Sequence, residues 1–348
     1  MRPEEITPAW LGEALGLPVL GTTCERVGTG LMAMNFRYRL ELDGDAPEGA
    51  PTSVVAKLPA DDDTSRATGF NLGSYEREVR FYDELAPSLA IRTPTCHLAS
   101  YDAEAPDFTL LLEDLAPARQ GDQIAGSTLE QAGVAMDEVA ALHGPRWNDR
   151  SLETVPWLAR PPERGLLLQG LYQAFWPPFC ATFAKYLTPE QLELGERYGA
   201  VVGAFIEGLP DPITVVHGDF RLENMMFATP EGGYPLAVVD WQTLALAFPG
   251  IDIAYFLGAG LLPEARREHE RALLDRYRAG LARFGVSEWS ADDVWEAYRL
   301  GAWHGVFMSV ISPNLVAVTD RSEAMFAAMV TRHFTHVQDV DAAGVLPS

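Results

Sequence analysis

The chain has 348 residues, and its 49 acidic against 26 basic side chains give a formal net charge of −23. Nucleic-acid-binding proteins usually show a basic footprint and anionic membranes attract basic segments, so this balance argues against both partners. The apolar content of 47 % is ordinary for a globular protein, and the length allows about two domains.

Cysteine usage and hydropathy exclude further classes. Cys24, Cys96 and Cys180 are scattered and form no CxxC pair, so neither a disulfide framework nor a zinc site is expected. The start of the chain is polar and acidic, unlike a signal peptide. The apolar run 251–262 is too short for a membrane span and contains Asp252. We therefore expect a cytoplasmic protein without a membrane span.

The first part of the chain is predicted to be a helix followed by strands. Thr7 as N-cap and Pro8 at the first helical position predict a helix over residues 7–16. Residues 61–69, DDDTSRATG, are predicted to be a polar loop. Apolar spacing predicts two strands within 24–42, a strand at 52–59, a helix at 74–87, and strands at 93–102 and 107–115.

Helices dominate after about residue 115. Short apolar runs at 213–216 and 235–239 predict a small β insertion among them. The predicted helices cover residues 128–144, 164–187, 189–209, 263–285 and 291–311. The fold class is therefore α+β, with a small β-rich N-terminal lobe (1–115) and a larger helical C-terminal lobe (116–348).

One motif carries candidate chemistry. In HGDFRLEN (217–224), Asp219 and Asn224 stand five residues apart after an apolar strand, and Asp240 ends the next apolar run. Oxygen ligands from an Asn and an Asp suit Mg²⁺, and a separate Asp can orient an acceptor hydroxyl and take its proton. Each residue alone is common in turns. The combination of two strands, the HGD turn and this spacing indicates a kinase-type site.

HGDFRLEN and VVDWQ resemble the aminoglycoside phosphotransferase and choline kinase superfamily, whose fold is similar to that of protein kinases. EREVRFYDELAP, LLLEDL, AALHGPRW and VVDWQTLALAFPGIDIAYFL most resemble its ecdysteroid kinase-like (CHK kinase-like) branch. The resemblance covers residues 20–340 and implies a two-lobed kinase-like fold. It also implies a nucleotide-binding N-lobe, and transfer of phosphate from ATP, with Mg²⁺, to a hydroxyl group of a small molecule.

The resemblance also implies roles for individual residues. Asp219 is expected to be the catalytic base, and Asn224 and Asp240 the metal ligands. Because DWQ stands where kinases have DFG, a DFG-type flip is not assumed. His217 is expected to hold the loop rather than transfer protons. Asp252 is expected to support the loop, or to cap a helix, or both.

The resemblance implies that Lys57, in VVAKLP, contacts the ATP phosphates. It is one of only two lysines, with Lys185, in a chain that otherwise uses arginine, and the two side chains are not interchangeable. Its anionic partner is expected to be Glu78, with Glu76 as the alternative. Lys185 lies in no motif and is expected at the surface.

The remaining nucleotide contacts are less specific. Gly28 and Gly30 fit either a loop whose N–H groups approach phosphates or an ordinary hairpin turn. Backbone at Glu113 to Leu115 in LLLEDL resembles the hinge that meets adenine, although a plain strand end also fits.

The sequence leaves the acceptor open. Aromatic residues in two predicted helices either line an apolar acceptor pocket or belong to the core: Phe175, Trp176, Phe179, Trp303, His304 and Phe307. An apolar pocket would suit a steroid-like, lipid-like or quaternary-amine alcohol, and an acidic pocket an aminoglycoside. The alternatives to a general small-molecule kinase are an aminoglycoside-type antibiotic phosphotransferase and a non-catalytic nucleotide-binding relative. A protein kinase is disfavoured, because no APE-like segment follows DWQ.

Overall fold

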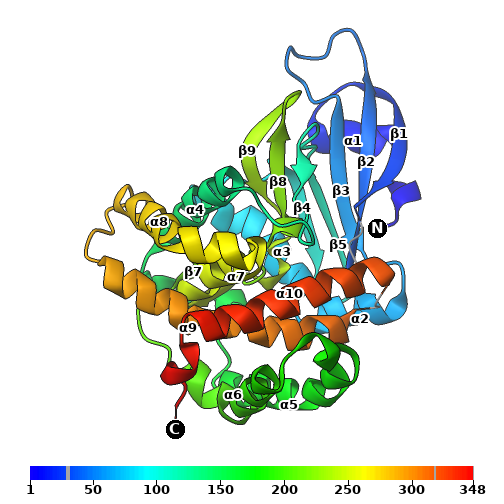
Figure 1. Ribbon diagram of the computed structural model, residues 1–348. Coiled ribbons are helices and arrows are strands. Elements are labelled where there is room, and N and C mark those ends of the chain that lie inside the picture. Colours follow the sequence, from blue (N-terminus) through cyan, green and yellow to red (C-terminus); the bar gives the residue numbers. More distant parts are fainter. Residues whose placement is uncertain (29–31, 317–318, 348) are drawn as a thin grey trace.

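The computed structural model describes residues 1–28, 32–316 and 319–347. Figure 1 shows an antiparallel sheet built from the N-terminal third of the chain, standing beside a larger, mostly helical part. The predicted α+β class is confirmed. The division at residue 115 stays a prediction, although the chain does leave the sheet at Glu113, where β5 ends.

The N-terminal sheet has five strands, and every neighbouring pair is antiparallel. Along the sheet the order is β1-β2-β3-β5-β4. The strands are β1 (Val19–Val27), β2 (Ala33–Leu42), β3 (Ser53–Pro59), β4 (Cys96–Asp102) and β5 (Asp107–Glu113). Strands β3 and β5 pair so that Lys57 of β3 lies opposite Leu110 of β5.

The two faces of this sheet pack against different elements. Leu110 and Leu112 belong to the main core of the molecule, whereas Leu111 between them belongs to a separate cluster with α1 (Pro8–Leu15). Alternate residues of a strand point to opposite faces, so β5 contributes to both layers. Helix α1 begins as predicted, because the Thr7 hydroxyl accepts a hydrogen bond from the Trp10 N–H at 3.2 Å.

The predicted polar loop at 61–69 is wrong. Residues Asp63–Asn71 form helix α2, which begins where the Asp62 carboxylate accepts the Ser65 N–H at 2.8 Å. The helix lacks an apolar stripe, and Gly69 is its only buried residue among those described. Periodicity therefore gave no signal; the cap and the close packing of Gly69 against the Tyr75 ring define the helix instead.

Helix α3 (Ser74–Arg80) follows and continues as a π-helical turn over Phe81–Leu85. Together they match the predicted helix at 74–87. The side chains of Tyr75, Glu78 and Val79 are buried, so this helix joins the N-terminal sheet to the rest of the core.

The C-terminal part contains the remaining helices and two small sheets. The helices are α4 (Leu129–His143), α5 (Arg164–Phe183), α6 (Pro189–Glu207), α7 (Gly250–Gly260), α8 (Pro263–Ala282), α9 (Ala291–Leu315) and α10 (Asp320–Asp339). One small sheet has the order β6-β8-β9, with β6 (Arg119–Gln120), β8 (Met225–Thr229) and β9 (Gly232–Val238). The other pairs β7 (Thr214–Val216) with β10 (Ala245–Ala247).

Helix α7 lies at the centre of this part, and all its residues are buried. A helix that is apolar on every side is stable only when it is enclosed by other elements. Its closest neighbour is α9, because a Cβ at Gly301 would lie only 1.9 Å from the Gly250 carbonyl oxygen. This close approach fixes the start of α7, which carries Asp252.

No helix of the described residues is long and apolar enough to cross a membrane.

Candidate active site

The HGD turn is held by a buried carboxylate. Asp252 accepts the backbone N–H of His217 at 2.7 Å and that of Gly218 at 2.9 Å. Its side chain is fully buried, and the His143 ring lies 3.2 Å away on the other side. Burial alone would raise the pKa of the Asp252 carboxyl, but the contact with His143 and the backbone hydrogen bonds hold the pKa below its usual range. A charged Asp252 therefore holds the HGD turn next to the start of α7 through these hydrogen bonds.

The His217 ring is committed to two structural hydrogen bonds. Its Nδ1 accepts the Asp219 N–H at 3.2 Å, and its Nε2 donates to the Val239 carbonyl at 3.1 Å. This pattern requires the neutral ring with its proton on Nε2. His217 therefore joins the HGD turn to the strand that ends just before Asp240, and neither ring nitrogen is left for an acceptor molecule.

Two side chains of the same loop donate hydrogen bonds to Asp219. The Arg221 Nε lies 3.0 Å from each of its carboxylate oxygens, and the Asn224 amide donates to Oδ2 at 2.8 Å and to the Asp219 carbonyl at 2.9 Å. The Asp219 side chain is 14 % exposed, so it is not fully enclosed by the protein.

Lys57 joins two carboxylates from distant segments. Its Nζ lies 2.7 Å from Glu78 in α3 and 2.8 Å from Asp240. Glu76, the alternative partner, instead faces Arg80 at 3.8 Å. Burial would lower the pKa of Lys57, but the two carboxylates outweigh it and raise that pKa, so the ammonium is charged.

The segment after Asp240 is fastened to α3. Glu78 accepts the Trp241 N–H at 3.2 Å, and the Trp241 ring stacks on Phe81 with centroids 3.9 Å apart. Arg77 donates to the Gln242 carbonyl at 2.9 Å. Asp240 itself has a φ of 69°, in the left-handed region that few residues other than glycine adopt. Such backbone strain is typical of functional sites.

Asn224 and Asp240 lie at adjacent strand ends, because the Val239 N–H donates to the Asn224 carbonyl at 3.0 Å. The Asn224 NH₂ group is engaged with Asp219, which leaves its side-chain oxygen for a cation. The Asp240 side chain is 29 % exposed. One amide and one carboxylate oxygen fit a Mg²⁺ ion that is also held by phosphates. The described residues contain no cluster of three or more His, Cys, Asp or Glu suited to a metal ion.

The segment LLLEDL has part of its backbone already engaged. The Glu113 N–H donates to Thr95 at 2.8 Å, and the Leu115 carbonyl accepts from Ala118 at 2.9 Å. The hinge role of this segment stays a prediction. Gly28 follows the last residue of β1 and has a φ of 73°, and Gly30 lies outside the described residues.

A family model described as the phosphotransferase enzyme family matches residues 56–295, more than half of the chain. The chain belongs to this family. The match contains Lys57, the HGD loop and Asp240, and ends within α9. The superfamily predicted from the motifs is thereby confirmed, and the narrower ecdysteroid kinase-like branch stays a prediction.

Solved structures share the fold of this chain. An aminoglycoside phosphotransferase of the APH(2") type in complex with GDP and kanamycin is 11 % identical with a TM-score of 0.55, and the match covers 95 % of this chain and 97 % of that one. A streptomycin–ATP complex of a related enzyme is 15 % identical with a TM-score of 0.50, covering 97 % and 98 %. The choline kinase LicA from Streptococcus pneumoniae is 12 % identical with a TM-score of 0.52, covering 97 % and 99 %. At these identities the likeness concerns the fold.

A local similarity reaches a much longer protein. The chain is 48 % identical over 52 residues to acyl-CoA dehydrogenase family member 10 of Mus musculus. The match spans 15 % of this chain and 5 % of that protein.

The aromatic residues of the C-terminal helices divide between core and site. Phe179, Trp303 and Phe307 are buried, and the Trp303 indole donates to the Ala342 carbonyl, so these residues belong to the core. His304 instead faces the HGD loop, because its Nε2 donates to the Gly218 carbonyl at 2.8 Å. Phe175 and Trp176 are half-buried on α5.

Two residues of the site escaped the sequence interpretation. Arg221 was overlooked, although its place two residues after Asp219 puts it within reach. The sequence did not indicate a role for Gln123, because this residue follows β6 in a polar stretch. Its amide accepts the Leu222 N–H at 3.1 Å and donates to the Ala259 carbonyl at 2.9 Å, which ties the loop to the end of α7.

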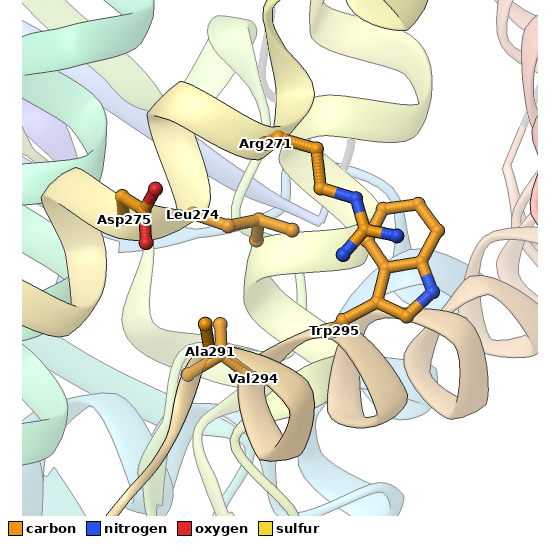
Figure 2. A pocket seen from close by; sticks show the side chains of 6 residues that line it. All are labelled: Arg271, Leu274, Asp275, Ala291, Val294 and Trp295. Carbon is orange, nitrogen blue, oxygen red and sulfur yellow. The ribbon is translucent and has the colours of Figure 1, made fainter.

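A separate hollow of about 140 Å³ lies between α8 and the first turns of α9 (Figure 2). There the Arg271 guanidinium covers the Trp295 ring at 3.2 Å from its centroid. None of the six lining residues takes part in the contacts around Asp219 or Lys57.

Proposed function

We propose that the chain is an ATP- and Mg²⁺-dependent kinase that phosphorylates a hydroxyl group of a small molecule. The observation that carries this proposal is the convergence of three segments. Lys57 from β3 and Glu78 from α3 meet Asp240, and Asn224, adjacent to Asp240 across the strand ends, contacts Asp219. Phosphoryl transfer needs such a combination of cation, metal ligands and proton acceptor in one place.

In this mechanism Lys57 offsets the negative charge of the ATP phosphates, and Glu78 keeps it in position. Asn224 and Asp240 would hold Mg²⁺, which supplies further charge compensation on the phosphates when bound. Asp219 orients the acceptor hydroxyl and takes its proton. Phosphoryl transfer requires no covalent bond to the protein. Most of the rate gain therefore comes from positioning and electrostatics.

The supporting residues follow from the same contacts. His217 and Asp252 hold the catalytic loop, since both bond its backbone. The N-terminal part, residues 1–115, would bind the nucleotide through Lys57, the turn at Gly28 and the backbone at Glu113 and Leu115. The C-terminal part, residues 116–348, would hold the catalytic loop and the acceptor.

The test is release of ADP from ATP in the presence of Mg²⁺ and a panel of small alcohols. We expect release that depends on both Mg²⁺ and one class of alcohol, and that is absent in Asp219→Asn. Nucleotide binding without transfer to any alcohol would support the non-catalytic alternative. Transfer to aminoglycosides alone would support the antibiotic-modifying alternative. We keep this alternative because the chain shares its fold with a relative whose structure contains kanamycin.

A further inference from the structure

The turn that carries Asn224 is bonded by one neighbouring segment. This turn is Leu222–Asn224, and the segment, residues 120–123, starts at the last residue of β6. On the near side of the turn, the Gln123 side-chain oxygen accepts the Leu222 N–H at 3.1 Å. Asn224 is only 4 % exposed, so the surrounding protein determines its position.

Two further hydrogen bonds complete this contact. The Gln120 side-chain amide donates to the Glu223 carbonyl at 2.5 Å, and the Gly121 N–H donates to the Met225 carbonyl at 2.9 Å. The approach is close, because a Cβ at Gly121 would lie only 2.7 Å from the Leu222 carbonyl oxygen. Hydrogen bonds from one segment therefore hold the backbone on both sides of the proposed metal ligand.

The segment is itself held by Arg332 of α10. The Arg332 guanidinium donates to the Gln123 carbonyl at 2.9 Å and to the Ile124 carbonyl at 2.7 Å. It also donates to the Ala259 carbonyl at 2.9 Å, in the last turn of α7. Carbonyls at a helix end lack helical partners, and an arginine is a favourable donor to them. The Gln123 amide donates to the same Ala259 carbonyl at 2.9 Å, so the three segments share one set of hydrogen bonds.

Arg332 and Gln123 thus form a hydrogen-bonded path from α10 to the Asn224 turn. Arg332 is 7 % exposed and Gln123 is 1 % exposed, so water does not substitute for their partners. A buried polar network that loses one partner is costly, and a complete one holds a single arrangement. In the part of the chain that the structure describes, no hydrogen bond joins either side chain to Lys57 or Asp240. The path therefore acts on one metal ligand and leaves the contacts of Lys57 alone.

We propose that Gln123 and Arg332 are positioning residues that set the metal affinity of the site through the Asn224 turn. The inference rests on the proposed kinase function, in which Asn224 is a ligand of Mg²⁺. Replacing a group that orients a metal ligand typically changes metal affinity by about 10- to 100-fold. The two residues accordingly govern how much Mg²⁺ strengthens nucleotide binding.

The first experiment measures the affinity for the ATP analogue AMP-PNP by calorimetry, with Mg²⁺ and with EDTA. The ratio of the two affinities is the gain that the metal supplies, and it requires no turnover. In Gln123→Met we expect this gain to fall by about tenfold, because the side chain keeps its size and loses both hydrogen bonds. Affinity in EDTA should stay unchanged. An unchanged gain, or an equal fall in both conditions, overturns the proposal.

Gln169→Met is the matched control for this experiment. The Gln169 side-chain oxygen also accepts a backbone N–H, that of Gly203 in α6 at 3.0 Å. We expect the metal-dependent gain to stay intact in this variant. A fall as large as that in Gln123→Met would show that any such loss weakens the site, and would overturn the proposal.

The second experiment uses Arg332→Met, with Arg299→Met as its control. Arg299 of α9 likewise donates to two backbone carbonyls, those of Val340 and Asp341 at 2.8 and 2.7 Å. We expect the gain to fall in Arg332→Met and to stay intact in Arg299→Met. Because Arg332 and Gln123 act through one segment, the double variant should lose less than the product of the two single losses. A full product would show independent action and overturn the path from α10.

Hydrogen exchange separates this inference from the proposed function. The Asn224 N–H donates to the Arg221 carbonyl at 2.9 Å, so Gln123→Met leaves its own acceptor in place. We expect this N–H to exchange about tenfold faster in Gln123→Met, because the turn opens more easily. Faster exchange supports the positioning even if the unmodified protein binds no nucleotide, in which case the kinase function fails alone. Unchanged exchange, together with turnover by the unmodified protein, overturns the positioning and leaves the kinase function standing.

Discussion

The Nε atom of Arg221 lies 3.0 Å from both carboxylate oxygens of Asp219. The side chain proposed to accept a proton is therefore held by a cation two residues away in the chain. Arg221 is itself anchored, because its Nη1 contacts Glu223 at 3.0 Å. The arrangement fixes the orientation of Asp219 before any substrate arrives, and such preorganisation is the main contribution a protein makes to phosphoryl transfer.

Replacing Arg221 tests this orientation. We expect Arg221→Gln to lower kcat by about 10²-fold, as misplacement of a catalytic group by ~1 Å does, with a smaller effect on KM for ATP. Steady-state kinetics at saturating ATP measure it. Arg321→Gln is the control, because Arg321 is 65 % exposed and lies 3.8 Å from the same Glu223. A normal kcat in Arg221→Gln would show that Asp219 needs no such support.

Replacing Asp219 tests the proposed base. Asp219→Asn keeps the size of the side chain but removes the proton acceptor, so we expect kcat to fall by about 10²- to 10⁴-fold. Binding of ATP, measured by calorimetry, should remain close to that of the unmodified protein, because Lys57 and Asp240 are untouched. Turnover near the normal level would remove Asp219 from this role.

The two lysines of the chain offer a matched pair of substitutions. Lys57→Arg keeps the charge but forces a larger planar group into a site where the side chain is 8 % exposed. We expect kcat/KM for ATP to fall by about 10²-fold, as on loss of a preorganised electrostatic contact. Lys185→Arg, at a side chain that is 59 % exposed, should be neutral. Equal behaviour of the two variants would contradict a phosphate-binding role for Lys57.

Asp252 is predicted to be essential for the stability of the loop. Asp252→Asn leaves one of the two backbone N–H groups of the HGD turn without an acceptor and removes the charge that faces His143. We expect the free energy of unfolding to fall by about 3 kcal/mol. Urea denaturation measures it, with Asp275→Asn on the exposed face of α8 as the control. A loss below ~1 kcal/mol would show that the turn is held mainly by other contacts.

Two buried histidines predict how stability depends on pH. The ring nitrogens of His333 and His336 have no hydrogen-bond partner among the described residues, and burial lowers the pKa of His333 to about 3 and that of His336 well below its usual value. The unfolded chain protonates both rings near its ordinary pKa of 6.5, whereas the folded protein does not. The folded state therefore binds fewer protons, and its stability falls as the pH drops below that value.

The expected slope is up to about 1.4 kcal/mol per pH unit for each histidine. Urea denaturation between about pH 5 and pH 7 measures it. His336→Leu should remove one histidine's share of the slope, because it removes a group that only the unfolded chain protonates. An unchanged slope in this variant would contradict the neutral, buried state of His336.

Much of the fold was readable from local patterns. The N-cap at Thr7, the alternation in β2 and the helical spacing of 74–87 act within a few residues, so the sequence alone predicts those elements. Helix α2 was missed because its residues 63–71 show no apolar stripe, and only its cap and its packing on Tyr75 define it.

The sequence by itself determined which residues are able to do chemistry. The spacing of Asp219, Asn224 and Asp240 and the isolated Lys57 were visible without coordinates, because each candidate is set by short-range order or by composition. Only the tertiary structure decided which partners these side chains have. Lys57 meets an Asp that lies 183 residues away, and Arg77 of α3 reaches the Gln242 carbonyl beyond Asp240. Contacts over such separations depend on how the elements pack, and spacing along the chain carries no record of that packing.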